Sequence, residues 1–391
     1  MKNILKTGLV VGAILLLAGC GKLSFDSDSS STTSTKSGSY QTTGTASDDT
    51  YQGVIKNGRY QVSKSRGLML TNNNQNGNTF NVRSMESGLQ SISQKEFSTD
   101  KYDFEEGQLL TTATARKWLG RQKGKYSKGS STDNALGLNP ASNGKTGENS
   151  RTPIYLQQIL EQDYMVSSGS NMSLGGIAIG LGMNSVDYYT KTSYGATYET
   201  KISDADLLAQ GKEMAKKVVA RIRKMKGVKN NTPIVVGIYK QAAQDSLVGG
   251  TYQTYVVSTS GDNIGSWHSM NQQNEVLPLV DGKKGVNTTV ANDFSNFSTQ
   301  IRSFFPTLAG VTAQAHYEDG QLAGLKVTVN TQFYGQTEIN SFTQYVVTAA
   351  SKYLPSGANI EINVQSVQGM QAFAERKTGE KSFYTHVFDS Y

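Results

Sequence analysis

The strongest constraint on the fold is an order of predicted elements that occurs twice along the chain. The first pass begins at Pro153, a residue that suits the first turn of a helix, and ends with the apolar strand 233–239. The second pass begins near Asn292 and ends with the strand 360–364. The distance between the passes far exceeds the roughly 20–50 residues of a solenoid repeat, so it indicates a duplicated domain. We therefore predict an α+β fold of two related α-β-β-α-β units with antiparallel sheets.

Apolar spacing predicts the elements of the first pass. The first helix would bury one stripe of side chains, and a second helix would begin at Asp204 and stop near Gly227. Between them, 175–181 is extended and 188–201 alternates like a hairpin arm. The stripe of the first predicted helix consists of Tyr155, Leu156, Ile159, Leu160 and Tyr164.

Upstream of the repeat the pattern predicts shorter elements. Residues 80–82 are strand-like, and a short helix would follow from Met85 to Phe97. A strand and turn at 102–110 would precede a helix that Thr112 caps.

Composition divides the chain into five segments. Residues 1–20 are expected to be a signal peptide, and 21–52 a disordered Ser/Thr-rich linker with too few apolar residues to bury. As a flexible coil this linker would reach about 30 Å. The remaining segments are an N-terminal α+β domain at 53–245, a connecting segment at 246–290 and a C-terminal α+β domain at 291–391.

The first twenty residues have the pattern of a bacterial lipoprotein signal. A basic start is followed by an uncharged apolar run of about a dozen residues, which is shorter than the roughly 20 that a membrane span needs. The run ends in a lipobox of Leu17, Ala18, Gly19 and Cys20, whose thiol would accept diacylglycerol. Signal peptidase II and a lipoprotein acyl transferase would act there during maturation. The expected location is the extracytoplasmic face of the cell membrane, held by the lipid anchor.

Cysteine usage and charge exclude several classes of protein. Cys20 is the single cysteine, so an acylated protein has no thiol for a disulfide, a thiolate metal site or a nucleophile. The net charge of +7 is modest for 391 residues. It is compatible with contact to anionic lipid or a cell-wall polymer, and we expect no nucleic-acid partner.

No set of residues predicts catalysis, a metal or a cofactor. His268, His316 and His386 lack metal-ligand spacing, and the glycines of 175–182 lie inside an apolar run rather than between a strand and a helix. A surface formed by Trp267, His268, Tyr252 and Tyr255 could stack against carbohydrate, but ordinary packing is the simpler interpretation.

One alternative to a binding role is an extracytoplasmic enzyme that acts on cell-wall glycans. Asp103, Glu105 and Glu106 form the densest acidic group, but the adjacent Glu105 and Glu106 cannot face each other from one element. Exposure of all three carboxylates to open solvent would exclude this alternative. A two-lobed solute receptor is disfavoured because the chain passes only once between its repeats.

The end of the signal peptide predicts a second product. Hydrolysis at the lipobox and one further cut would release an apolar heptapeptide that could diffuse as a signal. Its residues are Ala13, Ile14, Leu15, Leu16, Leu17, Ala18 and Gly19.

Several motifs of the chain resemble the CamS family of sex pheromone lipoproteins from Gram-positive bacteria. They include 60–67, 102–108, Trp118-Leu119, Leu138-Asn139-Pro140, 156–164 and 177–186. The resemblance implies a pheromone of pattern Ala-Ile-x-x-Leu-Ala-x, which Ala13, Ile14, Leu17 and Ala18 match. It implies no catalytic residues. We therefore expect a lipid-anchored, non-enzymatic surface lipoprotein whose mature part is a binding or interaction module.

Overall fold

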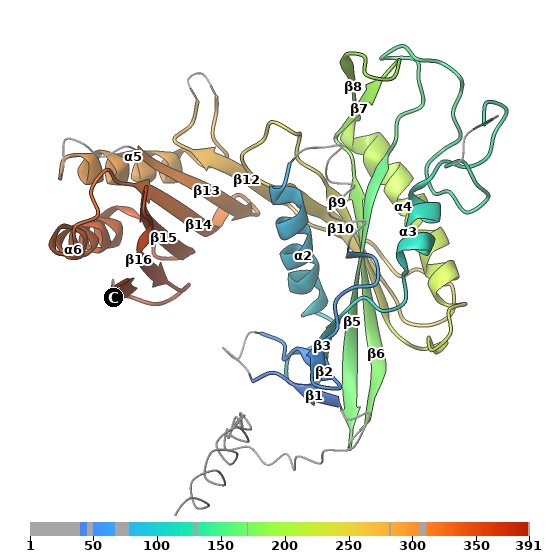
Figure 1. Cartoon of the computed structure of the whole chain (residues 1–391), viewed down its shortest axis with the longest axis horizontal. Coiled ribbons are helices and arrows are strands. Elements are labelled where there is room, and N and C mark those ends of the chain that lie inside the picture. Colours follow the sequence, from blue (N-terminus) through green and yellow to red (C-terminus); the bar gives the residue numbers. More distant parts are fainter. Residues whose placement is uncertain are drawn as a thin grey trace, which may run out of the picture.

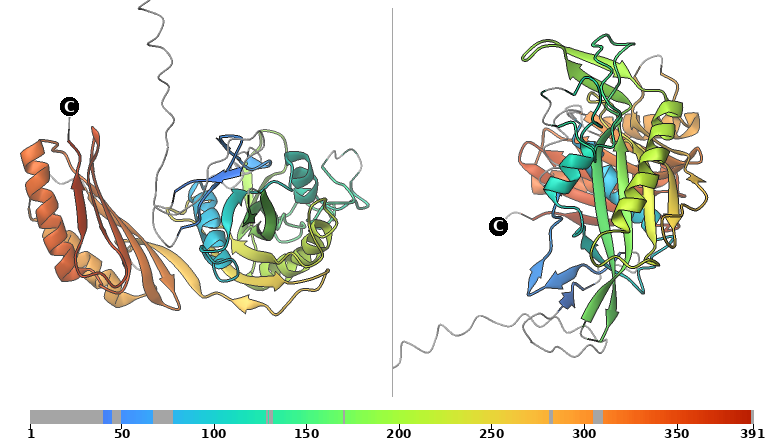
Figure 2. Two further views of the ribbon diagram at one scale, coloured as in Figure 1. Left: turned by 90° about the horizontal axis from the view of Figure 1, so that it is seen from below. Right: turned by 90° about the vertical axis from the view of Figure 1, so that its right-hand side faces the viewer.

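The structure is a computed structural model that describes residues 40–44, 50–66, 78–127, 129, 132–169, 171–280, 283–304 and 310–389. The described chain is α+β, as predicted, and it contains five helices and two six-stranded sheets. Figures 1 and 2 show the two sheets side by side in separate lobes, joined where β11 (His268–Ser269) is followed by β12 (Gln272–Leu277). None of the described helices has the length and apolar content that crossing a bilayer requires.

The first sheet has the strand order β11-β10-β9-β6-β5-β4. We call this sheet and its helices the first lobe. The long hairpin β5–β6 and the parallel pair β6–β9 form its centre. The strands are β4 (Asp103–Glu106), β5 (Leu156–Ser168), β6 (Asn171–Met183), β9 (Ile234–Lys240), β10 (Thr251–Ser258) and β11 (His268–Ser269).

The second sheet runs in sequence order, β12-β13-β14-β15-β16-β17, and belongs to the second lobe. Its helices are α5 (Thr288–Arg302) and α6 (Gln336–Tyr353). Its strands are β12 (Gln272–Leu277), β13 (Gly310–Glu318), β14 (Gln321–Asn330), β15 (Asn359–Ser366), β16 (Gly369–Arg376) and β17 (Tyr384–Val387).

The two sheets share one topology. Each has a single parallel pair, β6–β9 or β14–β15, and a helix connects the two strands of that pair, α4 (Asp204–Ile222) or α6. All other neighbours are antiparallel, and α3 (Thr112–Leu119) takes the place before β5 that α5 takes before β13. The repeated unit is therefore longer than α-β-β-α-β, because one strand precedes it and two follow it. The predicted connecting segment, 246–290, contributes β10 and β11 to the first sheet and β12 to the second.

Two small sheets complete the described chain. The strands β2 (Val54–Lys56) and β3 (Arg59–Tyr60) flank the turn at Asn57-Gly58, and β1 (Tyr40–Thr42) pairs with β2. β1 lies within the predicted linker, because pairing with β2 satisfies its backbone. The hairpin of β7 (Val186–Thr190) and β8 (Thr197–Lys201) extends from one end of the first lobe (Figure 1).

Helices cover both faces of the first sheet. α2 (Phe80–Ser93) packs on one face through Met85, Leu89 and Ile92, and α3 and α4 pack on the other. Residues 177–183 of β6 are consequently buried without interruption, which explains why this strand reads as a continuous apolar run.

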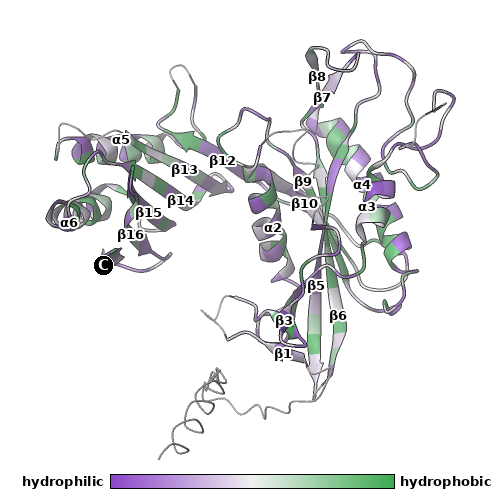
Figure 3. Ribbon diagram, in the orientation of Figure 1, coloured by the Kyte–Doolittle hydropathy of each residue, from purple (hydrophilic) through white to green (hydrophobic). Residues whose placement is uncertain are grey.

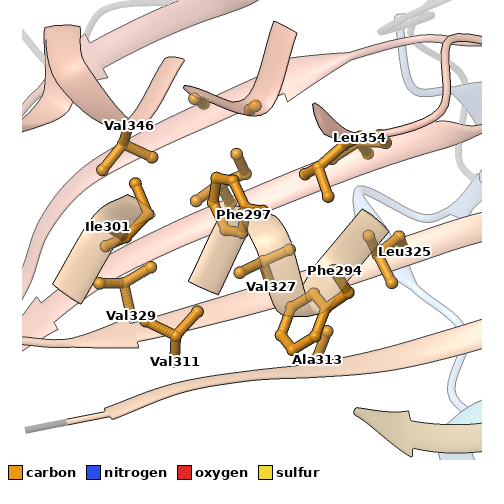
Figure 4. Close-up of a cluster of buried hydrophobic side chains, with 14 of the residues drawn as sticks. Phe294, Phe297, Ile301, Val311, Ala313, Leu325, Val327, Val329, Val346 and Leu354 are labelled. Carbon is orange, nitrogen blue, oxygen red and sulfur yellow. The ribbon is translucent and has the colours of Figure 1, made fainter. Parts of the chain in front are cut away.

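The second sheet carries helices on one face only. Figure 4 shows the core under α5 and α6, where Phe294, Phe297 and Ile301 of α5 meet alternate residues of β13 and β14. The intervening residues of these strands, such as Thr312 and Lys326, are exposed. This alternation of apolar and polar residues along the strands is visible in the hydropathy colours of Figure 3.

The helix predicted from Pro153 to Tyr164 is wrong, because these residues lead into and form the strand β5. The apolar spacing suited a helix stripe, but it arises from a strand buried on both faces. Ile159 contacts the α4 side of the sheet, whereas Leu160 and Tyr164 contact the α2 side. The polar residues between them are buried as well.

The structure also corrects two smaller boundaries. The strand-like residues 80–82 begin α2 instead, and the cap of α3 is Thr111 rather than Thr112. The Thr111 hydroxyl accepts a hydrogen bond from the Thr114 N–H, and Ser203 does the same for Asp206 at the start of α4. The predicted start of α4 at Asp204 is confirmed.

Glycines on three elements make room for one buried tyrosine in the first lobe. A Cβ on Gly237 of β9 or Gly180 of β6 would lie 2.6 Å from Tyr252, and one on Gly88 of α2 would lie 2.9 Å from it. The Tyr252 hydroxyl donates to the Met85 carbonyl at 3.0 Å, so the ring bridges β10 and α2. The glycines of this sheet are therefore packing positions.

We expect Gly237→Ala to destabilise the protein by about 1–3 kcal/mol, because the added methyl group overpacks the core against Tyr252. Gly324→Ala on β14 is the matched control, since its nearest neighbours lie 4.0 Å away. Denaturant unfolding of both variants measures the difference. Equal losses of stability would contradict the assignment of Gly237 as a packing position.

Candidate functional site

The residues predicted to carry the function lie mostly outside the described chain. Cys20, the rest of the lipobox and the heptapeptide 13–19 all precede Tyr40, where the description begins. The candidate site in the described residues is the acidic group on β4, which the sequence singled out.

β4 places its carboxylates against two more on β5. Glu105 pairs in register with Asp163, and Glu106 with Gln162. Glu161 and Asp163 are two residues apart, so both point to the α3 side of the sheet. Only 1% of Glu161 and 2% of Asp163 is exposed, so these carboxyl groups are inside the protein.

The loop from β4 to α3 covers the Glu161 and Asp163 carboxyl groups and donates backbone hydrogen bonds to them. The Gln108 N–H donates to Asp163 Oδ2 at 2.9 Å, and those of Leu109 and Leu110 donate to the two Glu161 oxygens at 2.8 and 2.6 Å. Gly107 is required here, because a Cβ would lie 2.5 Å from the Glu161 Cβ. Asp163 Oδ1 receives no hydrogen bond from any residue in the described ranges.

Burial is the main cause of the raised pKa values in this cluster of carboxyl groups. It raises the pKa of Asp163 well above its ordinary value, and the nearby Glu161 charge raises it further. It also raises the pKa of Glu161, although the Leu110 and Leu109 N–H groups oppose this. The Glu161 and Asp163 carboxyl groups therefore lie close enough for each to influence the pKa of the other. Burial raises the pKa of Glu105 too.

Glu106 holds the segment 60–66 against the first sheet. Its carboxylate accepts from the Ser63 N–H at 2.7 Å and the Tyr60 hydroxyl at 3.2 Å, and it forms an ion pair with Arg66. Burial and the adjacent Glu106 charge raise the pKa of Tyr60 to about 12. Gln108 also contributes, because its side chain donates to the Val62 carbonyl at 3.1 Å.

The acidic group predicted from sequence is therefore engaged inside the fold. Asp103 is half-buried and accepts from the Ser167 hydroxyl at 3.2 Å, while Glu105 is buried and Glu106 is ion-paired. The three do not point to open solvent. The loop 107–110 occupies the space beside the carboxyl pair, where a glycosidase would hold its sugar. This arrangement fixes the edge of the sheet.

Sequence reasoning missed Glu161 and Asp163 because they lay in a predicted helix. The available signal was the density of polar residues, from Gln157 to Asp163, inside an otherwise apolar segment. Such residues are retained in a buried strand only where each has a partner.

Two other sequence interpretations are settled by packing. The aromatic surface considered from the sequence is not formed, in agreement with the simpler interpretation of ordinary packing, since Tyr252 is a core residue with 1% of its surface exposed. Tyr255 stacks on His268 at 4.8 Å between ring centroids, while Trp267 packs with the α4 side of the sheet. Ordinary strand packing is confirmed for the glycines of 175–182, since a Cβ on Gly176 would lie 2.3 Å from Phe97.

Within the described ranges, no three His, Cys, Asp or Glu side chains are grouped so that they could hold a metal ion. His268, His316 and His386 lie on three different strands, β11, β13 and β17.

Two asparagines among the family-like motifs have structural roles. The Asn139 amide oxygen accepts from the N–H groups of Tyr155 and Leu156, and its nitrogen donates to the Leu119 carbonyl. Asn184 donates to the Ile154 carbonyl at 3.0 Å. Both side chains stabilise the start of β5.

We expect Asp163→Asn to gain stability relative to the wild type as the pH rises from about 4 to about 8. Folding raises the pKa of Asp163 above its ordinary value of 3.8. The contribution of Asp163 to the free energy of unfolding is therefore fully present below pH 3.8 and is lost as the pH rises, because the buried carboxyl group must then give up its proton. An amide is uncharged at every pH, so the variant does not undergo this loss. Thermal unfolding across this pH range measures the effect. Exposed Asp100→Asn is the control, and a constant loss of stability for Asp163→Asn at all pH values would contradict the raised pKa of Asp163.

Comparison with known proteins places the chain in a family. Residues 60–382 match the model of the family described as CamS sex pheromone cAM373 precursor. The chain is similar to a sex pheromone precursor from Lactobacillus salivarius subsp. salivarius UCC118 whose crystal structure is known, with 47% sequence identity and a TM-score of 0.83. That similarity covers 90% of this chain and 100% of the other. The C-terminal domain of the sex pheromone staph-cAM373 precursor from Staphylococcus aureus is 30% identical, with a TM-score of 0.69. That likeness covers 80% of this chain and 98% of the other.

No curated protein sequence matches the chain. The family match includes β4 to β16 and therefore most of both six-stranded sheets, and it agrees with the resemblance seen in the motifs. Sex pheromone precursors are not a known enzyme family. The chain belongs to the CamS family of sex pheromone precursors.

Proposed function

We propose that this protein is an extracytoplasmic lipoprotein, anchored to the outer face of the cell membrane by diacylglycerol on Cys20. The observation that carries this proposal is the sequence Leu17-Ala18-Gly19-Cys20 after a short apolar run. Each buried CH₂ of an acyl chain contributes about 0.8 kcal/mol, and two chains hold a protein stably where one is marginal. The diacylglycerol anchor therefore suffices to hold the body at the membrane.

We also propose that the signal peptide is the source of a heptapeptide pheromone, Ala13 to Gly19. Hydrolysis of the Gly19–Cys20 and Gly12–Ala13 bonds releases it. Membership of a pheromone-precursor family supports this proposal, as do Ala13, Ile14, Leu17 and Ala18 at the positions of the family pattern.

The mature body acts in this proposal as a binding module at the cell surface. The engagement of its β4 and β5 carboxylates in internal contacts supports a binding role over hydrolysis of wall glycans. A cell-wall polymer and the membrane itself are the partners within reach of a tethered body.

We expect Cys20→Ser to abolish incorporation of labelled fatty acid into the protein and to lower its share in the membrane fraction, because a hydroxyl replaces the acylated sulfur. Fractionation and labelling of the expressing cells measure both changes. Ser24→Ala, four residues further on, is the control and should behave like the wild type. Unchanged labelling of Cys20→Ser would refute the anchor.

We expect mass spectrometry of the culture supernatant to detect the peptide Ala13–Gly19 when the protein is expressed. Synthetic peptide of the same sequence provides the reference mass and fragmentation. A strain that carries Cys20→Ser serves as the control, since the lipobox is then not processed. Absence of the peptide from an expressing culture would remove the pheromone proposal and leave the anchor unaffected.

A further inference from the structure

The positive charge of this protein is concentrated in one short stretch. Residues 212–229, the second half of α4 and the loop after it, contain eight lysines and arginines and one carboxylate, Glu213. Their formal charge of +7 equals the net charge of the whole chain, so all other residues together are neutral. Figure 3 shows hydrophilic residues along α4 and the adjacent α3.

The lysines of this stretch face solvent. Five of them are exposed, and the sixth, Lys212, is partly exposed with its Nζ 5.3 Å from the Trp267 ring centroid. The five exposed lysines are Lys216, Lys217, Lys224, Lys226 and Lys229.

The two arginines of this stretch, Arg221 and Arg223, bind neighbouring elements of the first lobe and so fix the position of α4. The Arg223 side chain donates to the carbonyls of Gly261 and Ser258 at 2.7 and 3.1 Å, which fixes the end of α4 to the loop after β10. Arg221 donates to the Leu136 carbonyl at 2.8 Å and lies over the Trp118 ring of α3. α3 therefore lies against α4 and adds its own exposed cations, Arg116 and Lys117, to the surface.

Carboxylates do not neutralise this surface. Glu213 pairs with Lys216 at 2.7 Å, and Asp262 faces the internally bonded Arg223. Cations in the last turn of a helix interact favourably with its dipole, but that effect is confined to one turn. Lys212, Lys216 and Lys217 precede the last turn and Lys229 follows it, so helix stability does not account for them.

We propose that this surface, which we call the α4 basic face, docks onto the anionic lipid headgroups of the membrane that carries the anchor. The proposal rests on the anchor at Cys20 proposed above. Nineteen residues separate Cys20 from Tyr40, where the described chain begins, and fully extended they span at most roughly 65 Å. A tether of this length leaves the body free to turn its α4 side towards the bilayer.

Charge complementarity selects the partner. Each lysine close to an anionic bilayer strengthens binding about fivefold, through a field that salt screens. The described residues 204–229 expose no large apolar side chain. The face therefore binds the headgroup layer electrostatically without insertion, and two attachments, the acyl chains and the lysines, orient the body on the membrane.

The test uses the body from Tyr40 to the end of the chain, which lacks the anchor. The Lactobacillus salivarius relative was crystallised as a chain that matches 90% of this one, so a body of this extent folds. Flotation with phosphatidylcholine vesicles, with and without phosphatidylglycerol, measures binding. We expect binding only to the phosphatidylglycerol vesicles, and progressively weaker binding as the Debye length falls from about 30 Å at 0.01 M salt to about 8 Å at physiological salt.

The triple variant Lys217→Gln, Lys224→Gln, Lys226→Gln should weaken vesicle binding about 100-fold. The control removes the same charge elsewhere, through Lys101→Gln, Lys377→Gln and Lys381→Gln, which are exposed and lie outside the face. The control should retain most of the binding. Circular dichroism and thermal unfolding of both variants establish that they are folded.

Three results would overturn the proposal: no binding to phosphatidylglycerol vesicles at low salt, equal weakening in both triple variants, or binding to a purified anionic wall polymer without binding to vesicles. Each of these leaves the Cys20 anchor standing, because the body tested here has no anchor. Failure of fatty-acid labelling at Cys20 would instead remove the anchor while the vesicle result stood.

Discussion

The central strands of the first sheet are apolar on both faces, and the first lobe is built to cover both. α4 is the crossover that the parallel pair β6–β9 requires, and it covers one face together with α3. The other face has no crossover helix, so α2, from the segment before the repeat, covers it. The second lobe has the same topology but alternating strands, and α5 and α6 on one face complete its core. Strand composition therefore determines which duplicated unit has three layers and which has two.

Burial of β5 from Leu156 to Met165 explains why its polar residues are so closely tied to the rest of the protein. A buried carboxyl group is tolerated only with hydrogen-bond partners or with a proton, and backbone N–H groups supply such partners to Glu161 and Asp163. The loop 107–110 supplies the donors, and Glu106 anchors the segment that begins at Tyr60. Motifs that lie far apart in the sequence and resemble a known family thus meet at one edge of the sheet. Their role is to close this edge, which accounts for carboxylates that resemble a catalytic group in sequence.

The surface of the first lobe is organised differently from its interior. Inside, charge is avoided or shared between partners, whereas α4 concentrates cations on one side of the molecule. The proposed anchor and the proposed lipid contact are independent attachments to the same membrane. Their combination would present the β7–β8 hairpin and the second lobe in a constrained orientation, which a flexible tether alone cannot impose.

The sequence by itself determined the α+β class and the helices at 112–119 and 204–222, because local apolar spacing and caps such as Ser203 encode these features. It also indicated a repeated order of elements, but the first helix of the first repeat was wrong, since α3 takes that place. It also carries the whole case for the lipobox, since Cys20 lies outside the described residues. Only the tertiary structure decided that 156–168 is a strand, because a strand buried on both faces loses the period of two that would identify it. It alone placed Tyr252 among Gly88, Gly180 and Gly237, joined Glu161 to the loop 107–110, and set α3 beside the lysines of α4. These are contacts between residues distant in sequence, and local spacing holds no information about which distant group will supply a partner.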